Sequence, residues 1–490
     1  MKTYKIRNTI CRTLALTAVL TLVGTTGCSK KESFPVNPSG TPETTCEPIA
    51  QVDELFIKGD KDYFVPFQDP THSYCTISDG LGTPVRHQGQ GGCYSYSAVS
   101  TMQCAFLKAH GELIDINPID LINRIYTIPE HTVGKEPDYP EEKYYPSIGP
   151  ANDLGGDIYR VTGALCADPL NGYLISETNI YGNYNTEVSE FTLLSEAEVK
   201  EVIRKYGAVC MSVNYRQDCK EIHGYRAQNY QGDQIDHVAT IVGWDDDFPA
   251  DCFPTPAGRN GAWLVQNSFG EGWGNKGFYW VSFDMAIPGI SSSQVTKEFS
   301  SALSYGRFSR KSLYSPDMIS QKNFDERSLT DEDIRNAPDF AVASVYEKKG
   351  TVAAIGFWTS VRHQPYTVEI RDGEFGDVLA TLSGSFDYAG YHTVKLETPV
   401  SVKKFTVIVK TPGLAVFEGP AQETKVSTIF RKVDTHYEAK TKPGQSFIQA
   451  GEDWIDVTDT SIKSKLGLDN DPNWKEYTTP GDPCITVLFI

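Results

Sequence analysis

The chain has no surplus of basic residues. Its 490 residues carry 45 Lys and Arg against 63 Asp and Glu, which gives a formal net charge of −18 at pH 7. Binding a phosphate backbone requires a basic face, so this balance argues against nucleic acid as a partner. The composition is otherwise that of a globular protein, with 40% hydrophobic and 22% charged residues, and the length suggests two or three domains.

Long hydrophobic runs are missing, apart from one near the start. Leu14 to Val23 form an apolar core behind a basic head, and this core is too short to span a bilayer as a helix. Residues 25–28 read Thr-Thr-Gly-Cys and resemble the cleavage box of bacterial lipoproteins. We therefore predict a lipoprotein signal peptide over residues 1–27 and a lipid on Cys28. The protein would then lie in the bacterial cell envelope, periplasmic or surface-exposed, with the lipid anchor as its only membrane contact.

The segment behind this box lacks the features of a folded domain. Up to about residue 50 it is rich in Ser, Pro, Thr and Gly, so we predict a flexible tether over residues 28–75. This segment has no long helical pattern, and control by an inhibitory pro-region is therefore not expected. The chain also has no strong internal repeat.

The cysteines do not decide the redox state of the protein. Of eleven, one lies in the signal, one is Cys28, and Cys93 stands in a motif of its own. The remaining eight are Cys46, Cys75, Cys104, Cys166, Cys210, Cys219, Cys252 and Cys484. An even number is compatible with disulfides in an oxidising compartment and equally with buried thiols.

One glycine-rich segment delivers a cysteine to a helix start. Residues 83–98 read Thr-Pro-Val-Arg-His-Gln-Gly-Gln-Gly-Gly-Cys-Tyr-Ser-Tyr-Ser-Ala, and apolar residues at every fourth position from Tyr94 to Phe106 predict an amphipathic helix beginning at Cys93. A thiol in the first turn lies near unpaired N–H groups and the positive end of the helix dipole, which favours its thiolate. Gln88 lies just upstream, where its amide can reach a developing oxyanion.

Two further segments supply partners for such a thiol. A hydrolytic cysteine needs a base and a group that orients the base. His237 opens an apolar run over residues 237–244, and Asn267 stands in the segment Gln-Asn-Ser-Phe-Gly-Glu-Gly-Trp-Gly-Asn-Lys-Gly-Phe at residues 266–278. Each residue alone has a plain explanation, as a buried thiol, a core histidine or a turn asparagine. Their occurrence together favours a catalytic site.

These three segments, in this order, resemble the motifs of papain-like (C1 family) cysteine peptidases. The resemblance implies that Cys93 is the nucleophile, that His237 is its imidazolium partner and that Asn267 orients the imidazole. Gln88 would stabilise the oxyanion together with the backbone N–H of Cys93. The protein would then hydrolyse peptide bonds of proteins or peptides through a thioester, with no cofactor and no metal ion.

The match also has departures. The segment from Gln88 to Cys93 is one residue shorter than usual, Gln90 replaces a cysteine, and Tyr94 and Phe269 replace tryptophans. Because the essential groups remain, we expect activity, either weak or dependent on an activating change. Two other functions stay open. One is a transglutaminase-type acyl transferase, which the Asn267 segment disfavours, and the other is a non-catalytic surface protein that binds peptides or glycans.

The segments around the motifs predict the fold. A capping box at residues 195–198 predicts a helix that ends at Gly207, and runs at 208–213, 237–244, 261–267 and 277–282 predict strands. We therefore expect an α+β papain-like domain over residues 76–300 whose helical and β-rich halves face each other. Gly155 and Gly156 resemble the glycine pair of the family's substrate cleft, where bare backbone pairs with an extended peptide. The plain alternative for them is a turn.

After residue 300 the pattern changes to short alternating runs. These predict separate strands at 351–358, 366–370, 378–382, 392–396 and 405–410, and hence an all-β sandwich over residues 301–490. Segments at 340–346, 355–358 and 388–394 resemble the lectin-like domain that follows the peptidase in some bacterial papain-family proteins. Glycan binding stays open, because Trp358, Tyr388 and Trp454 are either sugar-stacking aromatics or sandwich core.

Overall fold

The structure is a computed structural model, and the residues it describes lie after the predicted signal peptide. It describes residues 62–88, 91–126, 141–143, 155–185, 193–215, 219–230, 232, 235–307, 309–314, 330–418, 421–427, 432–438, 441–467, 469 and 480–490. The signal peptide, Cys28, Cys46 and most of the tether lie outside these residues, so their predictions stay predictions. No helix within these ranges has the length and apolarity needed to cross a membrane.

The first unit combines a helical side with a sheet. Its helices are α2 (Cys93–His110), α3 (Pro118–Tyr126), α4 (Ile158–Cys166) and α5 (Glu196–Tyr206), with 3-10 turns η3 (Thr76–Asp79) and η6 (Ala250–Cys252). Its strands are β1 (Ser73–Cys75), β2 (Glu141–Lys143), β3 (Leu174–Tyr184), β4 (Val209–Val213), β5 (Lys220–Ile222), β6 (Tyr225–Gln228), β7 (His237–Asp245), β8 (Ala262–Gln266), β9 (Phe278–Ser282) and β10 (Ile287–Thr296). The capped helix, now α5, and the four strands predicted between residues 208 and 282 are confirmed.

α2 is the central helix of this unit. It begins at Cys93 as predicted and ends at Gly111, whose backbone φ of +74° suits a residue without a side chain. Residues 94–106 are all buried, so the prediction of an amphipathic helix is wrong. α2 contacts α3 and α4 as well as β4, β7 and β10, and its polar side chains are therefore hydrogen-bonded inside the protein. Thr101, for example, donates from Oγ1 to the Ser97 carbonyl at 2.9 Å.

The sheet of the first unit brings two strand ends together. β7 pairs antiparallel with β4 on one side and with β8 on the other. The register opposes Thr240 to Gln266, so the end of β8 lies beside the first half of β7. His237 is the first residue of β7, and Asn267 directly follows β8. The ladder therefore delivers both side chains to one edge of the domain.

The second unit is rich in β-strands, as predicted. It contains β11 (Ser301–Ser304), β12 (Ser309–Tyr314), β13 (Asp339–Thr359), β14 (Pro365–Asp372), β15 (Val378–Ser385), β16 (Ala389–Pro412), β17 (Leu414–Glu418), β18 (Ala421–Ser427), β19 (Lys432–Glu438), β20 (Ser446–Ala450), β21 (Asp453–Asp456) and β22 (Thr486–Phe489), with short helices α7 (Asp331–Arg335) and α8 (Ile462–Lys465). The prediction that its strands are all short is wrong. The runs at 392–396 and 405–410 belong to one strand of 24 residues, β16, which pairs with the 21-residue strand β13.

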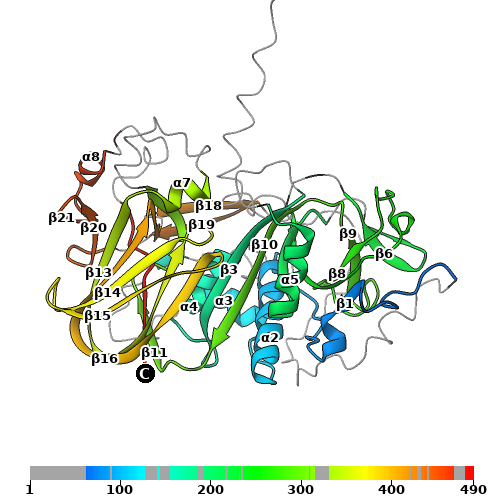
Figure 1. The fold of residues 1–490 in the computed structure, drawn as a ribbon, viewed down its shortest axis with the longest axis horizontal. Helices are drawn as coiled ribbons and strands as arrows, with labels where there is room; N and C mark the ends of the chain where they lie inside the picture. The colour runs from blue at the N-terminus through cyan, green and yellow to red at the C-terminus, as the bar shows by residue number, and fades with distance from the viewer. Residues whose placement is uncertain are drawn as a thin grey trace, which may run out of the picture.

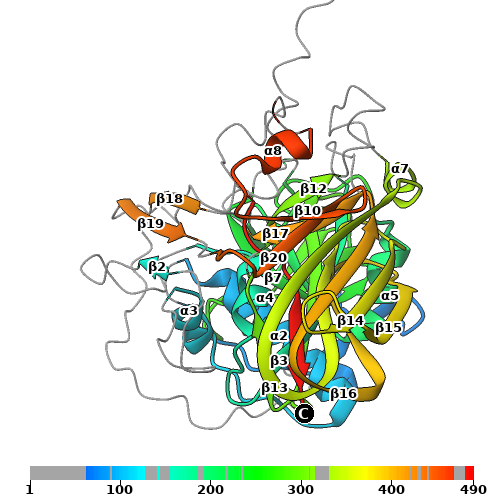
Figure 2. The same cartoon turned by 90° about the vertical axis from the view of Figure 1, so that its left-hand side faces the viewer.

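The two units share a sheet. In Figure 1 the first unit, with α2 and α5, lies on the right, the second lies on the left, and β3 and β10 run between them. Residues 177–180 of β3 pair with residues 389–392 of β16. A Cβ on Gly390 would stand 1.8 Å from the carbonyl oxygen of Thr178, so the close approach of these strands requires glycine at this position. A small sheet of β18, β19 and β2, at the left of Figure 2, adds a second backbone connection between the units.

His392 lies buried where β16 meets β3, with 2% of its surface exposed. Its Nε2 donates to the Tyr388 carbonyl at 3.0 Å, and its ring stacks on Phe386 with 3.9 Å between centroids. Burial lowers the pKa of His392 from 6.5 to about 4. Since the unfolded chain binds this proton first, folding stability is complete above pH 6.5 and declines as the pH falls toward 4.

We expect this histidine to cost about 2 kcal/mol of unfolding free energy at pH 5 relative to pH 8. A His392→Gln variant keeps a donor for the Tyr388 carbonyl but cannot be protonated, so its stability should depend less on pH in this range. Urea unfolding of both proteins at pH 5 and pH 8 measures the difference. Equal pH dependence in the two proteins would contradict the prediction.

Candidate active site

A buried histidine and asparagine form the centre of the site. His237 and Asn267 are 3% and 2% exposed, and His237 Nε2 lies 2.8 Å from Asn267 Oδ1. The same oxygen accepts the backbone N–H of Ser268 at 2.8 Å, which orients the amide with its oxygen toward the ring. Nε2 therefore carries the hydrogen, and Nδ1 is the basic nitrogen of the neutral imidazole.

Aromatic rings enclose this hydrogen bond. The His237 ring lies 5.1 Å from Phe269 and 5.3 Å from Tyr215, and Trp273 packs edge-on against Phe269 at 5.5 Å. By excluding water, these rings strengthen the bond between His237 and Asn267. Phe269 and Trp273 both lie in the segment that contains Asn267. Tyr215 lies outside this segment, and the sequence near it carries no catalytic pattern.

The surroundings of His237 favour its neutral form. Burial lowers the pKa of His237 below its ordinary value of 6.5, while the bond to Asn267 and the negative charge of Asp236 act in the opposite direction and more weakly. A positive charge on this ring therefore needs a negative partner close by. A thiolate is such a partner.

Cys93 differs from most cysteines of the chain in its exposure. Of the eight described cysteines, six are buried, whereas Cys93 and Cys219 are partly exposed. Burial raises the pKa of Cys75 to about 11 and that of Cys104 to about 12, so both stay protonated at neutral pH. Cys93 is the first residue of the 18-residue helix α2, where the backbone N–H groups have no partners within the helix.

Hydrogen bonds one helical turn further on align α2 with β7. Ser97 Oγ donates to the Ala239 carbonyl at 2.8 Å and lies 2.9 Å from Thr240 Oγ1. The four helical residues from Cys93 to Ser97 span about 6 Å, and the two strand residues from His237 to Ala239 span about 6.6 Å. Further along, the Cys104 side chain of α2 packs on Gly207, two residues before β4, and the first residue of β4, Val209, pairs with Ile241, beyond Ala239 on β7. The helix and the strand thus run in the same direction, with Cys93 and His237 at the same end.

Gln88 is held next to Asn267. Its backbone N–H donates to the Ser268 carbonyl at 2.7 Å, and Ser268 Oγ donates to Gln88 Oε1. Because the side-chain oxygen of Gln88 accepts this bond, its amide nitrogen is the atom that is left to donate elsewhere. Ser268 therefore contacts both Asn267 and Gln88. No sequence pattern marks Ser268 as a functional residue, although it directly follows Asn267 in the motif.

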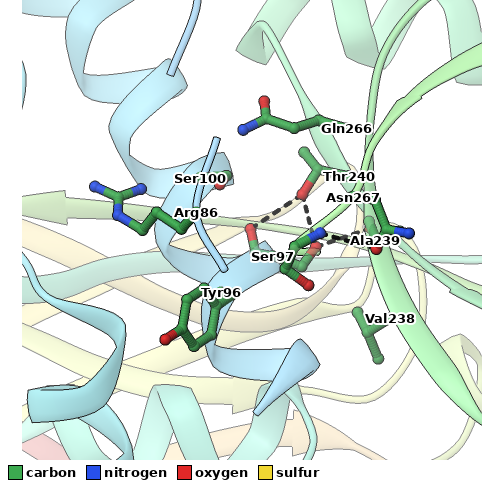
Figure 3. A pocket seen from close by; sticks show the side chains of 10 residues that line it. Arg86, Tyr96, Ser97, Ser100, Val238, Ala239, Thr240, Gln266 and Asn267 are labelled. Carbon is green, nitrogen blue, oxygen red and sulfur yellow. Dashed lines mark hydrogen bonds between the residues drawn. The ribbon is translucent and has the colours of Figure 1, made fainter. Parts of the chain in front are cut away.

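A small cavity lies next to Asn267, between α2, the start of β7 and the end of β8 (Figure 3). Its lining residues are Arg86, Tyr96, Ser97, Ser100, Val238, Ala239, Thr240, Gln266, Asn267 and Ser268. It is of the size that holds about one water molecule, which is far below the volume of a substrate pocket. The cavity belongs to the support of the site and does not receive a substrate side chain.

Gly155 and Gly156 lie on the other side of the α2 start. They directly precede Asp157, which caps α4 by accepting the Arg160 N–H at 2.9 Å. A Cβ on Gly156 would stand 2.5 Å from the ring of Tyr94, the residue after Cys93. This close packing explains the second glycine of the pair and places it against the helix that carries the thiol.

Among the described residues, one group has the composition of a metal site. Asp69, His72 and Asp247 bring three ligand atoms within 4.8 Å of one another. All are at least partly exposed, and His72 Nδ1 lies 3.1 Å from an Asp247 oxygen, as in a surface ion pair. We assign no metal to this group.

Each of the two units matches a known protein family. Residues 76–298 match the papain family of cysteine proteases, and residues 324–468 match the lectin-like domain family. The first unit is therefore a papain-family cysteine peptidase domain, and the second is a β-rich lectin-like domain, as the motifs predicted.

Individual relatives are distant. The chain is 23% identical to mouse (Mus musculus) cathepsin K over 213 residues, which is 41% of this chain and 56% of that protein. It is also 23% identical over 238 residues to the Arabidopsis thaliana protein named "Probable cysteine protease RD19B", covering 46% of this chain and 62% of the relative. The chain thus spans less than two thirds of these relatives.

Solved structures of one protein resemble both units together. The cysteine protease and lectin-like domains of Cwp84, a surface layer associated protein of Clostridium difficile, match with a TM-score of 0.59 at 17% identity, over 86% of this chain and 89% of that one. Clostridial Cwp84 after propeptide cleavage matches with a TM-score of 0.57 at 18% identity, over 85% and 98%. At this identity the likeness concerns the fold.

Proposed function

We propose that this protein is a cysteine peptidase of the bacterial cell envelope that hydrolyses peptide bonds. The hydrogen bond between His237 Nε2 and Asn267 Oδ1, closed off by aromatic rings, is the observation that carries the proposal. This bond leaves His237 Nδ1 as the base. His237 is the first residue of β7, and Cys93 is the first residue of α2, which is aligned with β7. A core histidine without a catalytic role would need neither this orientation nor a partly exposed thiol at the start of the helix that is aligned with its strand.

In the first half of the reaction, Cys93 is the nucleophile. Its proton moves to His237 Nδ1, and the thiolate attacks the carbonyl carbon of the scissile bond. The oxyanion that develops accepts hydrogen bonds from the Gln88 amide nitrogen and the Cys93 backbone N–H. His237 then donates its proton to the leaving amine, the C–N bond breaks, and a thioester on Cys93 remains.

In the second half, water replaces the amine. His237 accepts a proton from a water molecule that attacks the thioester, and the same two donors stabilise the second oxyanion. The carbon–sulfur bond breaks, and the acid product leaves. Asn267 keeps the ring oriented through both halves, and as a neutral amide it adds no charge to the site.

The location and partners follow from the wider sequence. We propose that Cys28 carries the lipid, that residues 28–75 tether the enzyme, and that residues 76–300 and 301–490 are the peptidase and lectin-like domains. A cell-surface location is in keeping with the likeness to Cwp84, which is described as surface layer associated. Protein substrates fit a peptidase, and glycans are candidate ligands of the lectin-like domain.

Hydrolysis of a denatured protein tests the activity. The purified chain should release peptides from denatured casein, and a thiol-directed epoxide should block this release. Intact casein after long incubation with excess enzyme, together with binding on a glycan array, would favour the non-catalytic alternative.

Gln88→Ala is expected to lower kcat about 10²-fold, the usual cost of one oxyanion donor. Alkylation of Cys93 by iodoacetamide should stay near the wild-type rate, since this reaction develops no oxyanion. Ser268→Ala serves as the graded comparison. It removes one hydrogen bond to Gln88, worth about 1 kcal/mol, and should reduce kcat several-fold. Equal kcat in the wild type and Gln88→Ala would remove Gln88 from the site.

A further inference from the structure

The lectin-like domain inserts an aromatic side chain into the core of the peptidase domain. Trp358, near the end of β13, is 6% exposed and belongs to the hydrophobic core formed mainly by α2, α3 and α4. Its neighbour Phe357 is 1% exposed but belongs to the separate core of the lectin-like domain, where it contacts Tyr366 and Phe386. Two consecutive residues of one strand thus serve two domains. Trp358 is core and does not form a sugar-binding face.

Trp358 packs on the helix that begins at the glycine pair. Its ring stacks on Tyr159, with 5.3 Å between centroids and 25° between planes. Tyr159 lies in the first turn of α4, three residues after Gly156. In Figure 1, α4 lies where the two units meet. On its other side Trp358 contacts Tyr391 at 5.8 Å, which is held in the ladder between β16 and β3. The position of the indole is therefore fixed from the lectin-like domain.

Tyr94, the residue after Cys93, packs against the same segment, residues 155–159. The Tyr94 ring occupies the space that a side chain on Gly156 would need. The segment from Gly155 to Tyr159 is thus held between the residue after Cys93 and a tryptophan of the neighbouring domain. Further along, α4 meets the second unit through β12 and through Cys166, whose side chain lies against Thr486.

We propose that Trp358 is a positioning residue of the peptidase: it fixes the start of α4 and, through it, the backbone of Gly155 and Gly156 that binds an extended peptide. This proposal builds on the proposed peptidase function and concerns substrate binding. It makes the lectin-like domain part of the substrate cleft without any contact to the substrate. Because Trp358 acts through Tyr159 and the start of α4, its loss should affect binding of peptides and spare the chemistry of Cys93.

The test compares two neighbouring substitutions. Trp358→Leu removes the stacking partner of Tyr159, whereas Phe357→Leu removes a ring of the same strand from the lectin-like core. Hydrogen exchange of the backbone amides at residues 157–166 should become at least about fivefold faster in Trp358→Leu and stay unchanged in Phe357→Leu. Trp358→Phe, which can still stack on Tyr159, should restore slow exchange.

Kinetics on a peptide substrate give the second measurement. Trp358→Leu should raise KM about tenfold with kcat within twofold of the wild type, and iodoacetamide should alkylate Cys93 at the wild-type rate. Unchanged exchange in Trp358→Leu, or equal acceleration by Phe357→Leu, would overturn the proposal, as would a fall in kcat at constant KM. A wild type that does not cleave peptides would defeat the proposed function alone, because the exchange measurement still decides the role of Trp358.

Discussion

Cys93→Ala should abolish hydrolysis of denatured protein, with a loss on the order of 10⁴-fold or more. The variant keeps the fold, because the side chain is only partly buried at the start of α2, but it has no atom that can form the acyl-enzyme. Covalent labelling by a thiol-directed epoxide should disappear with the activity. Peptide release from casein and mass spectrometry of the intact labelled protein measure the two effects.

Cys219→Ala provides the matched control. Among the described residues, Cys219 is the other partly exposed cysteine. Its replacement should leave activity and labelling unchanged. Labelling that persists in Cys93→Ala and vanishes in Cys219→Ala would overturn the assignment of the nucleophile.

The same variant separates peptidase from acyl transferase. Both enzymes form a thioester, so loss of activity in Cys93→Ala agrees with either. They differ in what takes the acyl group. Preference for an added primary amine over water, measured by mass spectrometry of the products, would favour the transglutaminase-type alternative. Product acids alone agree with hydrolysis.

The catalytic residues were predictable because the chain encodes their surroundings locally. Glycines precede Cys93 at the start of α2, and the apolar runs that follow His237 and precede Asn267 are typical of buried strands. The contacts that assemble them were not predictable. Ser97 meets Ala239, and Gln88 meets Ser268, across more than 100 residues of sequence. No local pattern specifies such pairs.

The lectin-like domain shows where periodicity misleads. The sequence predicts two separate strands at 392–396 and 405–410, which in the structure are both part of β16. The stretch between them contains Pro399 and a series of exposed polar residues, which are features of a turn. In the structure β16 pairs with β13 on both sides of this stretch, residues 396–399 have no partner in β13, and the register shifts twice. The register shifts and the exposed side chains interrupt the alternation of apolar and polar residues along β16, so the sequence predicts two strands in place of one. Pairing between strands, which the sequence does not display, keeps the strand continuous.

Burial of α2 has a similar explanation. Four apolar positions predicted one buried stripe, yet the rest of the helix also contacts other elements, and its buried residues include Ser95, Ser97 and Thr101. In the sequence, these small hydroxyl side chains suggest a solvent-exposed face of the helix. Inside the protein they are satisfied by carbonyl and hydroxyl partners, and one of these bonds sets the register between α2 and β7. The polar residues that obscured the packing thus help to build the site.

His237→Ala is the second change with a large expected effect, because it should return Cys93 to the behaviour of an ordinary thiol. Burial lowers the pKa of His237, so its imidazolium is stable only beside a negative charge. Proton transfer from Cys93 supplies that charge, and the pair ionises as a unit at a pH below the ordinary thiol pKa of about 8.5. The wild-type thiol should therefore react well at pH 6, whereas the variant should react well only at alkaline pH.

The rate of alkylation by iodoacetamide between pH 5 and pH 9 measures this shift. At pH 6 an ordinary thiol is less than about 1% ionised, so His237→Ala should react on the order of 10²-fold more slowly than the wild type. Asn267→Ala keeps the imidazole but loses the bond that orients it, and its profile should lie between the two. If all three proteins showed the same alkaline profile, the imidazole would not share the thiol proton. Cys93 would then be a surface thiol, and a peptide- or glycan-binding role would explain the fold better than catalysis.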